Sequence, residues 1–124
     1  MTVSLRRQRR ARTRAIPSYL IVAQADRLDE VRLATSILPI CAHGRVIVEA
    51  PADAELPIVE LPARLGLTRH RDASGAVRAW ASEMLCDEDA ARSVWVLGDD
   101  AFRAEVTRTL SDDYGLDADS FVRG

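Results

Sequence analysis

Charged and polar side chains stand at four points of this sequence where an apolar, strand-like run ends. In a parallel sheet the carboxyl ends of the strands meet at one edge, where ligands of such folds bind. The residue types suit a dinucleotide, because a carboxylate can accept hydrogen bonds from ribose hydroxyls and an arginine can balance phosphate charge. The predicted cofactor-binding residues are Ala23, Gln24, Ala25, Asp26, Glu49, His70, Arg71, Gly98 and Asp99.

The loop after the first run is unusual for a phosphate site. Nucleotide-binding folds normally lay the pyrophosphate on a glycine-rich turn and on the exposed amides of a helix N-terminus. Here the turn Gln24–Asp26 holds no glycine, and Asp29 and Glu30 follow it. Phosphate at this place would meet carboxylates.

Each of these residues also has a purely structural interpretation. Glu49 and Arg71 are compatible with solvated charges at strand ends, and Asp99 is compatible with a helix cap. His70 has no nucleophile placed with it, so a surface histidine explains it as well as acid–base chemistry does. The sequence predicts no catalytic residue and no metal site.

The elements that must position these residues follow from hydrophobic patterning. Short apolar runs alternate with segments of helical spacing, which is typical of an α/β domain. We therefore expect a three-layer, Rossmann-like domain with a mainly parallel, five-stranded sheet. The expected strands are Tyr19–Ala23, Arg45–Glu49, Leu67–Arg71, Ser93–Leu97 and Ser120–Arg123, with a brief further strand possible at 58–61.

Three helices are expected between the strands. The first spans 26–38 and is capped by Asp26, with Leu28, Val31, Ala34, Thr35, Ile37 and Leu38 on or beside its inner face. The second follows a Ser74 cap, and its core stripe is Val77, Trp80, Ala81, Met84 and Leu85. The third begins after Asp99 or Asp100, buries Phe102, Val106, Thr109 and Leu110, and ends at a left-handed Gly115.

Composition limits the chain to one domain. It has 124 residues, of which 48% are hydrophobic, and its two cysteines, Cys41 and Cys86, form neither a disulfide framework nor a zinc motif. The first 14 residues hold six Arg and no acid, so they carry +6, whereas the remainder holds 11 Arg and 19 acids and carries −8. We divide the chain into an Arg-rich arm, 1–17, expected to be disordered, and a folded domain, 18–124.

The arm is compatible with several partners. Clustered arginines attract nucleic acid, an anionic membrane or an acidic protein surface, and the absence of interleaved aromatic residues argues against base stacking. The arm and the apolar run after it imitate a secretory signal, but Pro17 and Ser18 interrupt the run. No segment has the length of a membrane span. We expect a cytoplasmic protein.

Several short motifs, taken in order, resemble one known family. They are Tyr19–Ala23, Ser36–Pro39, Val48–Glu49, His70–Arg71, Val94–Asp99 and Asp113–Asp117. In their order and spacing, from Tyr19 to Gly124, they resemble the C-terminal domain of the siderophore-interacting proteins, flavin-dependent ferric-siderophore reductases related to ferredoxin reductases.

The resemblance implies NAD(P)H binding by this domain. In the family the N-terminal half is a β-barrel that holds FAD, and electrons pass from nicotinamide through flavin to Fe(III). No FAD is expected on this chain alone, so activity as a ferric-siderophore oxidoreductase would need a flavin-binding partner protein. Two other functions stay open: a non-catalytic interaction or regulatory module that keeps the scaffold without the cofactor, and another small-molecule or enzymatic use of the same cleft.

Overall fold

The computed structural model describes residues 18–39, 42–57, 59–62, 64–84 and 92–122. The Arg-rich arm and both cysteines lie outside the described residues. In chain order the elements are β1 (Ser18–Gln24), η1 (Ala25–Arg27), α2 (Leu28–Ser36), β2 (His43–Glu49), β3 (Leu65–His70), α3 (Ala73–Met84), β4 (Arg92–Leu97), α4 (Asp100–Arg108), η2 (Thr109–Asp113) and η3 (Ala118–Ser120).

The four strands form one parallel sheet in the order β3-β2-β1-β4. Gln24 is opposite Glu49, and Glu49 is in turn opposite His70, so these three residues lie in one row at the carboxyl edge. Gly44 of β2 passes very close to β1, and a Cβ at this position would overlap the backbone carbonyl of Tyr19. The close approach explains why a glycine stands here.

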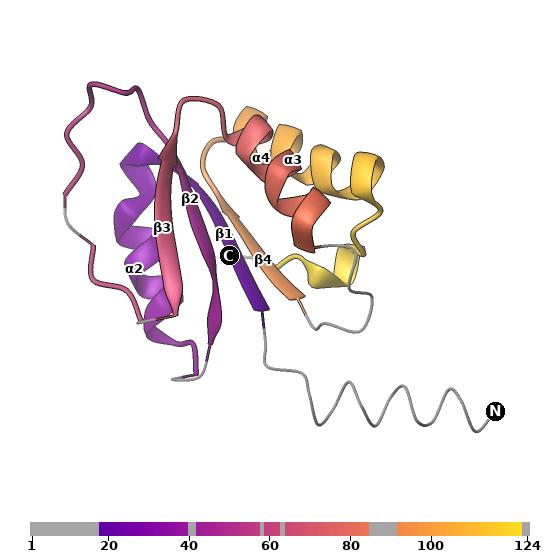
Figure 1. The fold of residues 1–124 in the computed structure, drawn as a ribbon, viewed down its shortest axis with the longest axis horizontal. Helices are drawn as coiled ribbons and strands as arrows, with labels where there is room; N and C mark the ends of the chain where they lie inside the picture. Colours follow the sequence, from indigo (N-terminus) through magenta and orange to yellow (C-terminus); the bar gives the residue numbers. More distant parts are fainter. Residues whose placement is uncertain (1–17, 40–41, 58, 63, 85–91, 123–124) are drawn as a thin grey trace.

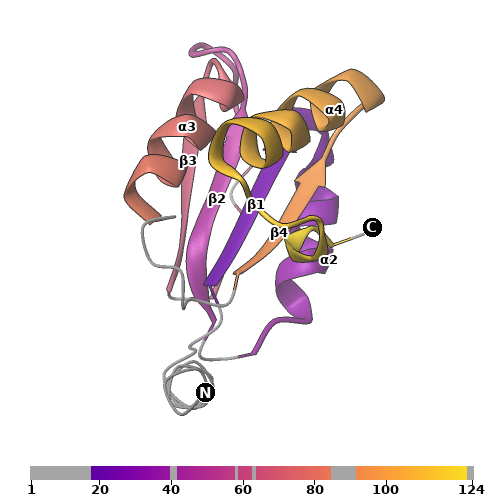
Figure 2. The same ribbon diagram turned by 90° about the vertical axis from the view of Figure 1, so that its right-hand side faces the viewer.

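Helices cover both faces of the sheet, with α2 on one side and α3 and α4 on the other (Figure 1, Figure 2). Successive β1 side chains enter the two cores alternately: Ile21 packs on the α2 side, whereas Leu20 and Val22 pack on the α3–α4 side. All three are at most 1% exposed. A central strand covered on both faces has no solvent side, which explains the continuous apolar run in the sequence. The α/β class and the three layers are confirmed.

The predicted inner faces of the second and third helices agree with the structure where it describes them. Val77, Trp80 and Ala81 of α3 are buried, and so are the four residues predicted to face inward from the third helix, Phe102, Val106, Thr109 and Leu110. The Met84 side chain and Leu85 lie outside the description. The helical segment formed by α4 and η2 ends before Gly115, whose φ of 68° is left-handed as predicted.

The prediction of five strands was wrong, because the described residues form four. Ser120–Arg123 was the expected fifth strand, but η3 occupies Ala118–Ser120, and only one isolated bridge follows, between Phe121 and Val94. The residues that were expected to run beside β4 are instead used in the 3-10 turn of η3, which follows the left-handed turn at Gly115. Arg123 lies outside the described residues.

The start and end of the first helix also differ from the prediction. A 3-10 turn precedes α2, and neither element has a side-chain cap, so Asp26 does not cap the helix. The α-helix ends at Ser36, where the hydroxyls of Thr35 and Ser36 donate to backbone carbonyls of the preceding turn. Ile37, expected beside the inner face, is 75% exposed.

Two further boundaries are corrected. Strand β3 begins two residues before the predicted Leu67 and ends one residue before Arg71. The cap of α3 is Asp72, whose Oδ1 accepts the Ser74 N–H at 3.1 Å, and not Ser74 itself. Of the possible strand at 58–61, residues 59–61 are not in a strand and residue 58 lies outside the description. The nearby prolines explain the lack of ladder pairing.

Candidate functional site

The sheet order changes direction between β1 and β4, which makes this the topological switch point, the place where open α/β sheets form their ligand crevice. The chain runs outward from β1 to β2 and β3, whereas β4 lies on the other side of β1. The loops that leave β1 and β4 therefore part at the carboxyl edge, and ligands of open α/β sheets bind at such a point. Gln24 ends β1, and Gly98 and Asp99 follow β4.

Gln24 and Asp99 bridge this crevice by two hydrogen bonds. The Asp99 backbone N–H donates to Gln24 Oε1 at 2.8 Å, and Gln24 Nε2 donates to Asp99 Oδ2 at 3.3 Å. We call this pair the Gln24–Asp99 clasp. It uses the side-chain amide of the residue that was predicted to face a cofactor.

The absence of a side chain at Gly98 leaves space for the Gln24 side chain in the clasp. A Cβ at this position would lie 2.6 Å from Gln24 Oε1 and 2.5 Å from the Cδ1 atom of Phe102. Real Cβ atoms do not approach other atoms so closely. Gly98 is therefore required for the present arrangement of Gln24 against the start of α4, and this close approach explains the glycine that ends the Val-Trp-Val-Leu run.

Asp99 is also the N-cap of α4. Its Oδ1 accepts the Phe102 N–H at 2.9 Å, which satisfies one of the unpaired amides of the first turn. This hydrogen bond, followed by the one from the Gln24 side chain, holds the pKa of the Asp99 carboxyl below its ordinary value of 3.8. The group is exposed and ionised at neutral pH. A second anion at this helix N-terminus would meet its charge.

Glu49 contacts a different helix. Its Oε2 accepts the Ala73 N–H at 3.0 Å, so the carboxylate lies over the start of α3. Because Glu49 is opposite Gln24 in the sheet, it is also one strand away from the crevice. The structure thus places it beside the clasp and gives it a structural role in addition to the predicted contact with ribose.

His70 and Arg71 lie farther from the crevice, at the end of the outer strand β3. His70 Nε2 is 2.9 Å from Thr68 Oγ1, and the His70 carbonyl accepts the Ala50 N–H. The Arg71 side chain is exposed and has no hydrogen bond or ion pair to another described residue. These residues share the carboxyl edge with Gln24, but β2 and β1 lie between them and the switch point.

The loop after β1 combines a buried start with a charged end. Ala23 is fully buried in the α2-side core, and Ala25 packs against the same core. Asp26 is exposed, with Oδ1 3.8 Å from the Nε atom of Arg27. Arg27 Nη1 also lies 3.4 Å from Glu30 Oε1, so one cation stands among the carboxylates that the sequence predicted at this place.

Arg27 was not among the predicted site residues, although its side chain lies beside Asp26 and Glu30 in this loop. It is the basic residue of the η1 turn, and its position directly after the predicted site residues was the available signal. Within the described ranges, no group of three or more His, Cys, Asp or Glu side chains is arranged to hold a metal ion. The described helices also include none that is long and apolar enough to cross a membrane.

The fold of this chain matches part of two solved structures, a siderophore-interacting protein and a siderophore utilization protein. The structure of SipS from Aeromonas hydrophila matches with a TM-score of 0.64 and 17% identity, over 84% of this chain and 47% of that one. A siderophore utilization protein from T. fusca matches with a TM-score of 0.61 and 20% identity, over 84% of this chain and 42% of that one. No family model and no curated protein sequence matches.

These likenesses extend over less than half of each solved structure. This chain corresponds to 47% of the SipS chain and 42% of the T. fusca chain. At 17% and 20% identity, the likeness establishes a shared fold. The predicted family is thus supported at the level of the fold.

Proposed function

We propose that this domain works in the cytoplasm as the NAD(P)H-binding half of a flavin-dependent ferric-siderophore reductase. A separate flavin-binding protein or domain would complete the reaction by accepting hydride from the nicotinamide. The observation that carries the proposal is the switch point between β1 and β4, in a fold that matches siderophore-interacting proteins. Open α/β sheets bind dinucleotides at this place.

The polar groups at the edge suit some parts of a dinucleotide better than others. The Gln24 amide can donate to and accept from a carboxamide, and Glu49 offers carboxylate oxygens to ribose hydroxyls. In the described part of the chain, the predicted loops of this edge offer Arg27 and the outlying Arg71 to balance the pyrophosphate, and Arg27 already contacts Glu30. We therefore expect binding that is weak, with NADH preferred over NADPH because Glu49 disfavours a 2′-phosphate.

Entry of a nicotinamide requires the Gln24 side chain to leave Asp99. Both hydrogen bonds of the clasp are exposed, so water can replace them and the cost of opening is small. The clasp therefore limits affinity without blocking the site.

The test is a titration of the ¹⁵N-labelled full chain with NADH and with NADPH, followed by NMR. The expected result is saturable shifts of the Gln24, Gly98 and Asp99 amides, at lower concentration for NADH. As a control, the Asp112→Asn variant, which changes an exposed carboxylate far along the chain from these strand ends, should show the same nucleotide-dependent shifts. No shift at these amides at millimolar NADH and NADPH would refute the proposal.

The Gln24–Asp99 clasp favours a second candidate, a non-catalytic interaction or regulatory module. In this alternative the clasp, the hydrogen bond from the Ala73 N–H to Glu49 and the Asp99 cap of α4 are the permanent roles of these residues. The same titration separates the two functions, because a module without cofactor gives no saturable shift with either nucleotide.

A further inference from the structure

A second hollow lies beside α4, next to the core on the α3–α4 side, against which its lining residues Val96 and Phe121 pack, and its lining includes neither Gln24 nor Asp99. It has a volume of about 260 Å³ and lies between α4 and the segment 118–122, over the outer edge of β4. Arg103, Thr107 and Ser111 line it from the helical side, and Val96, Ala118, Phe121 and Val122 line it from the strand side. One wall is therefore polar and the other is apolar.

Both walls are anchored to the rest of the fold. Helix α4 is capped by Asp99 and held by the buried Phe102 and Val106. The opposite wall is fixed where Val122 N–H donates to the Val94 carbonyl at 2.8 Å, next to the bridge between Phe121 and Val94. The hollow is thus formed by the fold before any ligand enters.

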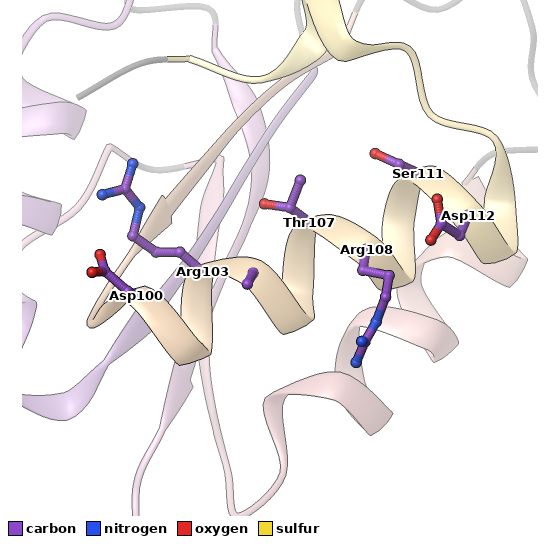
Figure 3. Close-up of a pocket in the computed structure, with 7 residues that line it drawn as sticks. Asp100, Arg103, Thr107, Arg108, Ser111 and Asp112 are labelled. Atoms are coloured by element: carbon purple, nitrogen blue, oxygen red, sulfur yellow. The ribbon is translucent and has the colours of Figure 1, made fainter.

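Arg103 supplies a cation that has no ion-pair partner among the described residues. Its side chain is exposed and makes no ion pair with Asp100, one turn earlier, or with any other described residue. Figure 3, which draws a different pocket that these three residues also line, shows Arg103, Thr107 and Ser111 on the same side of α4, with Arg108 directed to the other side. Four-residue steps place the three side chains in one row along the helix.

We propose that this hollow is a binding site for a small organic carboxylate with a flat apolar body. The guanidinium of Arg103 pairs with the carboxylate, in the planar two-bond geometry that arginine favours. The ring or chain of the ligand lies against Phe121, Val122 and Val96. Thr107 and Ser111 offer hydroxyls to a polar substituent on the same ligand.

The charge of the lining selects a monoanion. Arg103 is the one cationic side chain among the seven residues that line the hollow, and none of the seven is acidic. A monocarboxylate is neutralised by one guanidinium, whereas a phosphate would bring a second, unpaired charge. The apolar wall also requires a hydrophobic body, which inorganic anions lack.

The test is an NMR titration of the ¹⁵N-labelled full chain with benzoate, with its neutral isostere benzamide, and with inorganic phosphate. Benzoate should give saturable shifts at Val96, Thr107, Ser111 and Val122. Benzamide and phosphate should each bind at least about tenfold more weakly, because the charged hydrogen bond or the apolar contact is missing. The amides of Gln24 and Gly98 should not move, which separates this test from that of the proposed function.

Arg103→Gln and Arg108→Gln form a matched pair of variants. Both remove an exposed arginine from the same helix, but only the first removes the cation that lines the hollow. Arg103→Gln should weaken benzoate binding about tenfold, and Arg108→Gln should leave it unchanged. The proposal is overturned if benzoate gives no saturable shift at tens of millimolar, if benzamide binds equally well, or if the two variants behave alike.

Discussion

A double-mutant cycle at Gly98 and Gln24 tests whether the clasp exists as described. Gly98→Ala introduces a methyl group 2.6 Å from Gln24 Oε1 and 2.5 Å from the Phe102 ring. The Gln24 side chain can move away, but only by giving up its hydrogen bond with the Asp99 N–H. Phe102 is 6% exposed and has little room to move.

The magnitudes follow from these two contacts. Gln24→Ala removes one well-formed hydrogen bond of 2.8 Å at an exposed site, which costs about 1 kcal/mol. Gly98→Ala loses the same hydrogen bond and adds overpacking against Phe102, for a total of about 2 to 3 kcal/mol. In the double variant the hydrogen bond is lost once, so the total stays at about 2 to 3 kcal/mol. The expected coupling is therefore about 1 kcal/mol.

The assay is urea unfolding followed by tryptophan fluorescence, because Trp80 and Trp95 are both buried and belong to opposite faces of the sheet. In all three variants the free energy of unfolding should fall with urea concentration at the wild-type slope, so that only the midpoint of unfolding changes. If the cost of the double variant equals the sum of the two single costs, Gln24 does not occupy the space next to Gly98, and the description of the crevice is wrong.

Three further predictions concern charge, the core and the arm. The pKa of Asp99 in the folded protein lies below 3.8, so the stability that the ionised carboxylate contributes to the fold is fully present above that pH and is lost as the pH falls through the lower folded pKa. Asp99→Asn should therefore reduce the loss of stability at low pH, which is measured as urea midpoints down to about pH 3. Val77→Ala, at a fully buried position, should cost about 2 kcal/mol by thermal unfolding, whereas Leu33→Ala, at a position that is 68% exposed, should cost less than about 0.5 kcal/mol; similar costs would contradict the assigned packing of α3. If the six arginines of residues 1–14 bind phosphates, DNA affinity should fall with salt at a logarithmic slope of up to about −5, and deletion of these residues should abolish the slope; an unchanged slope would refute nucleic-acid binding by the arm.

Much of the fold could be predicted because its signals are local. The apolar run at Tyr19–Ala23 predicted a strand buried on both faces, and the spacing of Val77, Trp80 and Ala81 predicted the face of α3 that is buried. The fifth strand at Ser120–Arg123 was predicted from an equally local pattern. It failed because its pairing depends on how the preceding turn at Gly115 delivers the chain to β4, which residue types do not encode locally.

The candidate site also has a part that could be predicted from local sequence and a part that depends on long-range contacts. The sequence by itself determined which residues lie at the carboxyl edge, since strand ends can be read from hydrophobic runs. Only the tertiary structure decided their partners: Gln24 meets Asp99, 75 positions later, and Glu49 meets the start of α3. Strand order sets these contacts, and strand order is fixed by the packing of both cores together. The hydrophobic pattern therefore determined the elements, whereas the long-range topology decided which polar groups remain available to a ligand.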